Sequence, residues 1–490
     1  MLAGVLISRR RLISTTRLLL AASIATFASG CRSGDQRDGS AGSSSSSGSG
    51  AAGNEPEGGG ATPGATLVSM TPKGNVRWTK VVVEYANSTT ESDDEAAQTA
   101  GFASTSNLVL LNGLVYLGAG EEVRAHDAQD GRLVHRKPLK GAIGAAAITV
   151  AGGNGTEGDQ VLVACTDGSL YALEAVDLDV LWKSVCVQAS SMIGSETTRF
   201  PNGSEEVHRT YADANWHVTN IACRGNRAYV GFSSYQVDPG SHLICISLDD
   251  GSPVWTLPYP GRFASTDGQS ELFASDAGLV VPEPEATGVL LLDYESGAEI
   301  ARIEIDSPLG TGLTTAPEDA TRLFALSRQG TLYRLRAKPG SLNIEDAVAL
   351  SAVPEAGIAQ TIPSEARPVL FDGCLLCNLA RAKDAEDASI ALVDANTLQV
   401  IDTVQNFSLD TTPIVLQCRD DPARLLVICL GTDGLWQASY ESRHVGAFKR
   451  INDDVSCGKT AWDTFVPVDS QGTLYLASGN SNRQRLFAIS

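Results

Sequence analysis

One short pattern recurs along this chain from about residue 66 to its end. Each copy has an apolar run, a first position that is often Asp, a turn position four residues later that is often Gly, and often an aromatic residue four residues after that. Because one such unit cannot bury its own apolar faces, the units must stack on one another. The turn positions, 43 to 73 residues apart, are Gly74, Gly131, Leu178, Gly251, Gly297, Gly340, Leu398 and Arg443.

Short runs of Val, Ile, Leu and Tyr separate the turns, for example at Leu108–Leu111 and Leu425–Leu430. Runs of this length between Gly, Asp and Asn residues are typical of strands. The shortest spacings match the roughly 40–50 residues of a four-stranded propeller blade, and the longer ones indicate insertions. The sequence predicts an all-β chain that forms an eight-bladed β-propeller of four-stranded antiparallel blades. Seven blades are the alternative, if the segment near Arg443 is not a blade.

The two ends of the chain predict how the ring closes. Residues Leu486–Ser490 match the strand that precedes a repeat turn, so the last blade lacks its final strand. The segment from Asn75 to Val82 can supply that strand from the other end. Pairing the N- and C-terminal segments would remove two exposed sheet edges.

The repeat resembles that of pyrroloquinoline quinone-like (quinoprotein alcohol dehydrogenase-like) β-propellers, whose consensus is apolar–Asp–x–x–x–Gly–x–x–x–Trp. Residues 168–171, Gly-Ser-Leu-Tyr, and residues 330–333, Gly-Thr-Leu-Tyr, match the strand before that turn. The resemblance covers residues 66–490. Trp78, Trp182 and Trp255 occupy the tryptophan position, and we expect them to dock one blade against the next. A platform for stacking a ligand is the alternative for these side chains.

The resemblance also raises quinone-dependent catalysis, whose family site has two adjacent cysteines and a bound calcium. This sequence has no Cys-Cys pair, so we expect no enzyme activity, no cofactor, and no catalytic or metal-binding residues. A degenerate quinone-dependent or other propeller enzyme is the alternative. Residues 153–158 fit G-x-G-x-x-G, but the strand that follows them favours a hairpin loop over a dinucleotide site.

The cysteines are too few for a disulfide scaffold, since ten are spread over 490 residues. Cys374 and Cys377 are three positions apart on one expected strand, so they should point to opposite faces and stay buried as thiols. Cys418 and Cys429 flank a polar turn, and a disulfide across that hairpin is possible. Buried thiols are the alternative for this pair.

Residues 1–31 have the pattern of an export signal. Arg9, Arg10 and Arg11 precede an uncharged stretch, Leu18–Gly30, which is shorter than the roughly 20 residues that span a bilayer. The segment Ala28-Ser29-Gly30-Cys31 resembles a bacterial lipobox, which implies cleavage before Cys31 and lipid on its sulfur. Residues 8–14 resemble a twin-arginine signal, and the general secretory route is the alternative. An ordinary signal peptide is the alternative to a lipoprotein.

Residues 32–65 contain ten Gly and eight Ser. A segment of this composition cannot bury a core and forms a flexible linker. We therefore expect a disordered tether between a lipid anchor and a propeller domain at residues 66–490. This organisation predicts a membrane-anchored lipoprotein on the extracytoplasmic face, at the cell surface or in the periplasm.

The longest spacing between turns comes from an insertion at residues 187–216. Loops of more than about 12–15 residues are often functional, and this one carries Met192, Phe200, Tyr211 and Trp216, which we predict as a partner-binding surface. A passive surface excursion is the alternative for this loop. The formal net charge of −20 disfavours nucleic acid as that partner. We expect a non-catalytic scaffold that binds envelope or surface proteins. The closest family role is that of the propeller lipoprotein of the outer-membrane β-barrel assembly machinery.

Overall fold

A computed structural model describes the chain from Thr62 to Ser490, with gaps. Within the described residues every named secondary-structure element is a strand. No helix that could cross a membrane occurs there. The described residues are 62–63, 65–84, 106–140, 143–151, 159–188, 190–199, 205–213, 216–234, 241–259, 264–265, 268–269, 272–283, 287–309, 312–316, 319–350, 367–378, 389–405, 412–431, 434–455, 467–480 and 483–490.

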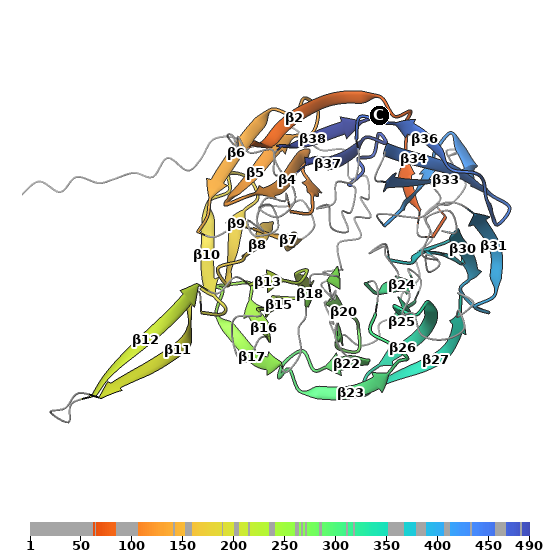
Figure 1. Ribbon diagram of the computed structural model, residues 1–490. Coiled ribbons are helices and arrows are strands. Elements are labelled where there is room, and N and C mark those ends of the chain that lie inside the picture. Colours follow the sequence, from red (N-terminus) through yellow and green to blue (C-terminus); the bar gives the residue numbers. More distant parts are fainter. Residues whose placement is uncertain are drawn as a thin grey trace, which may run out of the picture.

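The strands form eight antiparallel sheets arranged as the blades of a ring (Figure 1), which confirms the predicted propeller. Blade 1 is β3 (Val109–Leu111), β4 (Leu114–Ala119), β5 (Glu122–Asp127) and β6 (Leu133–Pro138). Blade 2 is β7 (Ile143–Ala151), β8 (Gln160–Cys165), β9 (Ser169–Glu174) and β10 (Val180–Val185). Blade 3 is β13 (His217–Val218) with β14 (Ala222–Arg224), then β15 (Arg227–Ser233), β16 (Ser241–Ser247) and β17 (Pro253–Tyr259). Blade 4 is β20 (Phe273–Ala274), β21 (Leu279–Pro282), β22 (Gly288–Leu292) and β23 (Glu299–Glu304).

The second half of the ring repeats this order. Blade 5 is β24 (Thr314–Ala316), β25 (Asp319–Leu326), β26 (Thr331–Lys338) and β27 (Ser341–Ala349). Blade 6 is β28 (Val369–Phe371), β29 (Cys374–Asn378), β30 (Ser389–Asp394) and β31 (Val400–Gln405). Blade 7 is β32 (Ile414–Cys418), β33 (Asp421–Gly431) and β34 (Gly434–Glu441), with β35 (His444–Val445) and β36 (Lys449–Asn452) both paired to β34. Blade 8 is β37 (Leu474–Asn480), β38 (Arg483–Ile489) and β2 (Val76–Glu84).

Two short ladders lie outside the blades. One joins β18 (Ala264–Ser265) to β19 (Gly268–Gln269), and the other joins β11 (Ser190–Arg199) to β12 (Glu205–Asp213). Arg443 lies between β34 and β35 of a complete blade, so the degenerate repeat is a blade and the seven-bladed alternative is wrong.

The ring closes through the two ends of the chain, as the sequence predicted. Strand β2 pairs antiparallel with β38, from Val76 opposite Ile489 to Glu84 opposite Arg483. Asn75 and Ser490 also exchange two backbone hydrogen bonds of 2.9 Å. The last blade therefore takes its outer strand from the start of the domain, and neither terminal strand is left as an open sheet edge.

A strap of residues before β2 crosses three blades. Strand β1 (Thr66–Val68) pairs in parallel with β32 of blade 7. Further upstream, the Thr62 N–H donates to the Gln417 side chain at 2.7 Å, and the Asp372 N–H donates to the Pro63 carbonyl at 3.1 Å. Thr62 and Pro63 therefore contact the ring although they lie before the domain boundary predicted at residue 66.

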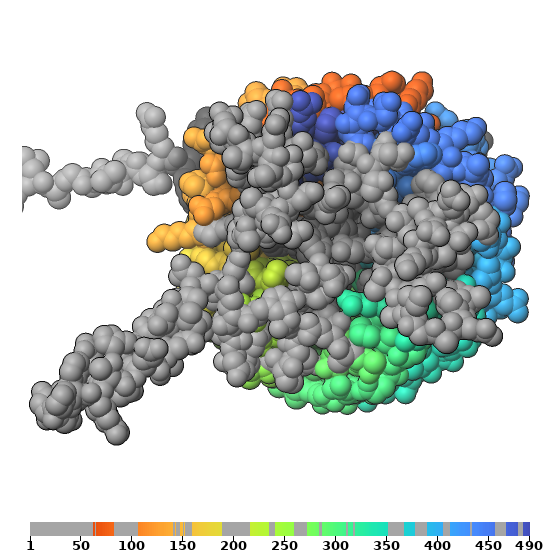
Figure 2. All heavy atoms as spheres, viewed as in Figure 1, coloured from red at the N-terminus to blue at the C-terminus, as the bar shows by residue number. Residues whose placement is uncertain are grey.

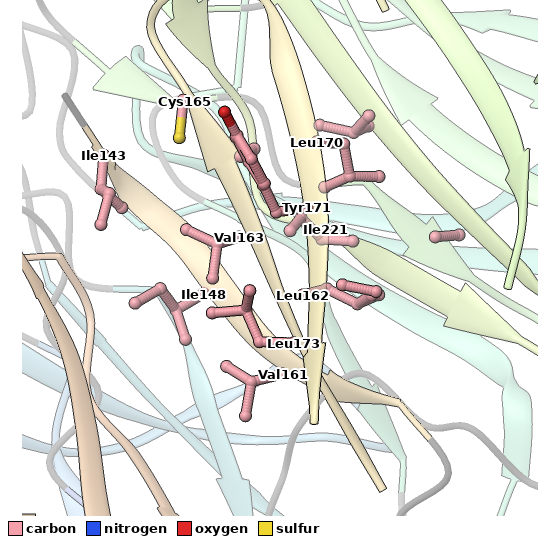
Figure 3. Packing of buried hydrophobic residues seen from close by; sticks show 14 of the residues in the cluster. Ile143, Ile148, Val161, Leu162, Val163, Cys165, Leu170, Tyr171, Leu173 and Ile221 are labelled. Atoms are coloured by element: carbon pink, nitrogen blue, oxygen red, sulfur yellow. The ribbon is translucent and has the colours of Figure 1, made fainter. Parts of the chain in front are cut away.

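The central strands of each blade are buried on both faces, which explains their continuous apolar runs. In blade 2, β8 and β9 bury consecutive residues rather than alternate ones. Figure 3 shows Val161, Leu162 and Val163 of β8 packed with Leu170 and Leu173 of β9 in one cluster. Neighbouring blades cover both faces of each sheet, and the burial of apolar surface between them drives the assembly of the ring.

Each tryptophan of the repeat packs on the turn of the following blade, and this confirms the predicted docking role. Each indole N–H donates to a carbonyl in that turn, as buried tryptophans usually do. The bonds are Trp78 to Ala128 at 3.2 Å, Trp182 to Leu248 at 3.0 Å and Trp255 to Tyr294 at 3.0 Å.

The glycine of the repeat is required by that tryptophan. Gly131, Gly251 and Gly297 all have φ near +70°, which disfavours other residues. A Cβ on Gly251 would also lie 2.5 Å from the Trp182 ring, and one on Gly131 would lie 2.5 Å from the Trp78 ring. Because the indole lies against the backbone of the turn, both the backbone angle and the available space exclude a side chain.

Where the preceding blade has no tryptophan, a side chain can replace this glycine. Leu178, Leu398 and Arg443 occupy the turn position with φ of 63°, 55° and 62°. Leu178 and Leu398 are buried, and Arg443 forms an ion pair with Asp394 of blade 6. The left-handed turn is therefore kept in all three blades, while the residue that fills the seam changes.

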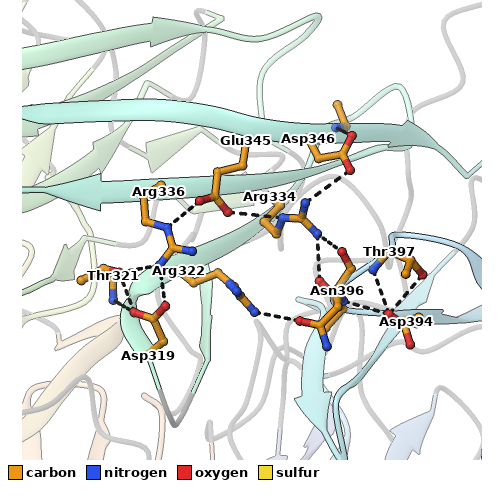
Figure 4. A network of polar contacts seen from close by, with 12 residues as sticks. Asp319, Thr321, Arg322, Arg334, Arg336, Glu345, Asp346, Asp394, Asn396 and Thr397 are labelled. Atoms are coloured by element: carbon orange, nitrogen blue, oxygen red, sulfur yellow. Dashed lines mark hydrogen bonds and ion pairs between the residues drawn. The ribbon is translucent and has the colours of Figure 1, made fainter.

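Polar side chains hold the seam between blades 5 and 6, where no tryptophan is present (Figure 4). Arg322 donates to the Asn396 side chain at 3.0 Å, and Arg334 donates to the Ala395 carbonyl at 3.3 Å. Arg336 is held on the other side by Glu345 at 2.6 Å and by Asp319. Because the planar guanidinium group has donors in fixed directions, contacts of one arginine to two partners fix its orientation as well as contributing energy.

We expect Gly251→Ala to destabilise the propeller more than Gly113→Ala does. Both glycines have positive φ, but a Cβ on Gly113 would meet nothing within 4 Å, whereas one on Gly251 overlaps the Trp182 ring. Overpacking of this kind costs about 1–3 kcal/mol. Urea denaturation of the two variants measures the difference, and equal midpoints would contradict the role of the tryptophan–glycine seam.

The Asp394 carboxylate at the seam of blades 6 and 7 should make stability depend on pH in the acid range. Burial alone would raise the pKa of Asp394, but hydrogen bonds from Arg443 and from two backbone N–H groups outweigh burial and lower this pKa to about 2. An unfolded Asp has a pKa of about 3.9. Asp394 therefore stabilises the fold above about pH 4, and this stabilisation is lost as the pH falls towards 2.

Asp394→Asn should remove this contribution. The stability difference between the natural protein and the variant should be full at pH 5 and should shrink as the pH falls from 4 towards 2, as measured by urea midpoints. Asp130→Asn, on an exposed turn of blade 1, is the control. A difference that does not change with pH would show that the Asp394 charge is not responsible.

Candidate functional site

The insertion between blades 2 and 3 is a β-hairpin that stands apart from the ring. Strands β11 and β12 pair antiparallel from Ser190 opposite Asp213 to Arg199 opposite Glu205, with a bulge between Met192 and Gly194. They form a two-stranded sheet of their own, and Figure 1 shows the hairpin projecting outward beside β10. The sequence predicted a long loop here, so the ladder is a finding of the structure.

The four predicted partner-binding residues have different positions. Met192 and Tyr211 are Cα partners on the hairpin ladder, and Phe200 is outside the described residues. Trp216 is only 2% exposed and belongs to the buried cluster of blades 2 and 3. The prediction that Trp216 offers an exposed aromatic surface is therefore wrong, because its ring is used in packing.

Trp216 instead fixes the root of the hairpin. Its indole N–H donates to the Gln188 carbonyl at 3.0 Å, which joins the two ends of the insertion. Its backbone N–H donates to the Thr166 carbonyl at 2.9 Å, in the turn between β8 and β9. Its ring also meets His242 of blade 3 edge-on, with centroids 5.7 Å apart. The hairpin is thus attached to both of its neighbouring blades.

Gly168 holds the other end of the root. The N–H groups of Cys186 and Val187 donate to the Gly168 carbonyl at 2.9 and 3.1 Å. Gly168 has φ of +83°, and a Cβ on it would overlap the Val187 side chain. The approach of the chain to this turn therefore needs glycine, and the insertion leaves the ring from a fixed position.

The strand that leads into the hairpin exposes three aliphatic side chains. Val180, Leu181 and Val185 of β10 are 42, 48 and 67% exposed. Strand β10 is the last strand of its sheet, and Trp182 and Ser184 face the opposite way into the protein. Lys183 is also exposed on β10, between Leu181 and Val185. Among the other outer strands, β31 exposes Val400 and Ile401, whereas the exposed residues of β23 in blade 4 are charged.

The thiols near the root are not reactive. Burial raises the pKa of Cys186 to about 12 and raises the pKa of Cys165 still further. A thiol is nucleophilic as its thiolate, so both side chains remain neutral and inert at physiological pH. No group of three or more metal-ligating side chains occurs among the residues that the structure describes.

The other cysteine predictions have mixed outcomes. Cys374 and Cys377 lie on β29 and belong to different buried clusters, so they do point to opposite faces.

Cys418 and Cys429 lie at opposite ends of the β32–β33 ladder, since Cys418 is opposite Asp421 while Ile428 is opposite Ile414. At about 3.3 Å per residue they are more than about 13 Å apart. A disulfide needs Cα atoms within about 7 Å, so the predicted disulfide is wrong.

Two sequence predictions fall outside the described part of the chain. Cys31 lies there, together with the whole predicted export signal, and so does the glycine-rich segment 153–158. The strands on either side of that segment, β7 and β8, pair as neighbours in an antiparallel ladder. The segment therefore connects two hairpin strands, whereas a dinucleotide fingerprint needs a strand followed by a helix.

Comparison with known proteins supports the repeat assignment. A family model described as outer membrane protein assembly factor BamB matches residues 35–209. No curated protein sequence matches the chain.

Among solved structures, the quinohemoprotein alcohol dehydrogenase from Comamonas testosteroni has a TM-score of 0.53 and 11% identity, over 87% of this chain and 78% of that one. A europium-containing methanol dehydrogenase has a TM-score of 0.53 and 9% identity, over 87% of this chain and 96% of that one. BamB from Moraxella catarrhalis has a TM-score of 0.49 and 12% identity, over 79% of this chain and 99% of that one. At these identities the likeness concerns the fold.

The class of protein follows from the blades and their seams. The chain is a β-propeller of eight blades, closed by its own termini. At three of its seams the tryptophan of one blade packs on the glycine of the next, and the quinoprotein structures share the propeller fold.

Proposed function

We propose that this chain is a lipid-anchored extracytoplasmic propeller that binds other envelope proteins, without chemistry of its own, through the hairpin of residues 187–216. The observation that carries the proposal is the β11–β12 hairpin, which belongs to no blade and has a rigid root. The blade interiors are filled by packed side chains, so a partner must bind to a segment that projects from the ring. The match of residues 35–209 to the model of an outer membrane assembly factor supports a role in protein assembly.

The position of the strap supports this choice of surface. In blades 1 to 6 the turn between the first and second strands lies on one face of the ring, and the turn between the second and third strands lies on the other. The strap contacts Asp372, between β28 and β29, whereas the hairpin root contacts Thr166 and Gly168, between β8 and β9. A tether that ends at Thr62 therefore reaches the face opposite the hairpin root and leaves the root face open to partners.

The proposed anchor is a lipid on Cys31. The basic segment, the short uncharged stretch and the small residues before Cys31 support processing as a lipoprotein. A single acyl chain binds membranes only marginally, so stable attachment needs the two chains of a diacylglyceryl group. The Gly- and Ser-rich segment that follows would give a reach of about 30 Å.

Cys31→Ala should release the protein from membranes or leave it as the uncleaved precursor. Fractionation and the mass of the N-terminal peptide measure both outcomes. Cys418→Ala is the matched control, since Cys418 contacts the Ser69 carbonyl and lies in the folded ring. Normal processing and unchanged membrane retention of the Cys31 variant would rule out the anchor.

Replacing residues 189–215 by a short Gly/Ser turn should keep the fold and abolish partner capture. The replacement keeps the hydrogen bond between Trp216 and Gln188, so the root and both blades remain intact. Losing an anchor residue at an interface often costs 2 kcal/mol or more, about 30-fold in affinity. Crosslinking and pull-down of the full-length protein from native membranes measures the loss.

The matched control replaces the acidic insertion at residues 85–101 in the same way. It tests whether shortening any insertion disturbs capture. Partner lists that are identical for the hairpin replacement, the control and the natural protein would remove the hairpin from the proposed function.

A further inference from the structure

The backbone of the hairpin is incompletely paired. In the part of the chain that the structure describes, β11 and β12 pair with each other and with no third strand. In an antiparallel pair, alternate residues direct both their N–H and C=O groups away from the partner strand. Each hairpin edge therefore presents a row of donors and acceptors at strand spacing, which is a template for another strand. An isolated two-stranded hairpin is also only marginally stable in water.

We propose that the partner binds by strand addition, with an extended segment of a second polypeptide pairing along the free edge of β11. This inference rests on the proposed function and specifies how the same hairpin recognises its partner. A third strand would satisfy the unpaired backbone row and convert a marginal hairpin into a sheet.

The charge distribution favours β11 over β12. Strand β12 carries Glu205, Glu206, Arg209 and Asp213 in nine residues, and charged residues on an edge strand oppose the addition of another strand. Strand β11 carries only Glu196 and, at its last position, Arg199. It also contains Thr197 and Thr198, which are β-branched and favour strands.

The surroundings of the hairpin define the chemistry of the partner segment. The exposed aliphatic side chains of β10 lie on the strand that leads into the hairpin, and Val185 is the residue nearest to it along the chain. The protein has a net charge of −20, so a segment with apolar residues and few acidic ones is complementary. The root bonds of Trp216 and Gly168 hold the hairpin in place before binding, which lowers the entropic cost of association.

Register-resolved crosslinking of the full-length protein in native membranes tests strand addition. A photo-crosslinking amino acid replaces Ser195 or Thr197, which are two positions apart on β11. If a strand adds to β11, the two variants should crosslink to residues of one partner that are also two positions apart. Arg302 on β23, the outer strand of a blade without a hairpin, is the control position and should give no such pattern.

Two results would overturn the inference. One is scattered or absent crosslinks from β11, while the hairpin replacement still abolishes capture; the hairpin would then remain the binding site, and strand addition would be wrong. The other is an in-register pattern to β11 of a second copy of this chain, which would replace the partner polypeptide by a homodimer. An in-register pattern to a different polypeptide supports the inference.

A pair of proline variants provides a second test. Thr197 and Thr198 are adjacent, so one backbone N–H points towards β12 and the other points to the free edge. Proline at the outward position removes only an edge donor, which edge strands tolerate. Slow amide hydrogen exchange on β12 identifies the proline variant in which the β11–β12 ladder is intact. In that variant the amount of captured partner should fall at least tenfold. Undiminished capture by the variant with an intact ladder would contradict strand addition.

Discussion

The propeller depends on how the outer strand of one blade packs on the turn of the next. At three seams an indole lies against a glycine in the left-handed conformation and donates to a carbonyl of the same turn. This arrangement sets how closely the blades approach, because a Cβ on Gly131 or Gly251 would overlap the indole. One of these seams, between Trp78 and Gly131, also joins the strand taken from the N-terminus to blade 1.

The remaining seams show what can replace this contact. The left-handed turn is retained at Leu178, Leu398 and Arg443, although each residue has a Cβ. Between blades 5 and 6 the space is bridged by arginines that reach carbonyl and amide groups of the neighbouring blade. A residue with positive φ is therefore retained at the turn position, although the turn is a two-residue hairpin at Arg443, and different residues fill the seams.

The repeat made the blades and their closure predictable, because each of its marker residues acts within one turn or one contact. Asp127 accepts hydrogen bonds from its own turn, and Gly131 has a positive φ and packs against Trp78. The hairpin was not predictable in this way. Its residues lack the apolar runs of the blades, and its position was apparent only as a longer spacing. The burial of Trp216 had a signal in the sequence, since the strand pattern of blade 3 begins at the next residue. The wrong disulfide has a different cause: even a simple turn at residues 419–424 would place Cys418 opposite Leu425, four residues from Cys429. The observed ladder pairs Cys418 with Asp421, which leaves Cys429 further along β33.

The proposed function uses two segments of the protein, the strap for the tether and the hairpin for the partner, and each is attached to different blades. The strap is bound through backbone hydrogen bonds at blades 6, 7 and 8, so tension on a membrane tether would act first on Thr62 and β1 and not on the closing strand β2. Figure 2 shows the first described residues of the domain lying along the C-terminal blades at the rim of the ring. The hairpin is attached to blades 2 and 3, on the other side of the ring from that segment (Figure 1). A pull on the chain upstream of Thr62 would therefore not act directly on the Trp216 root. Under the proposed function, the ring closed by β2 and β38 would hold a partner at one site while it is tethered at another, because the two attachments share no strand.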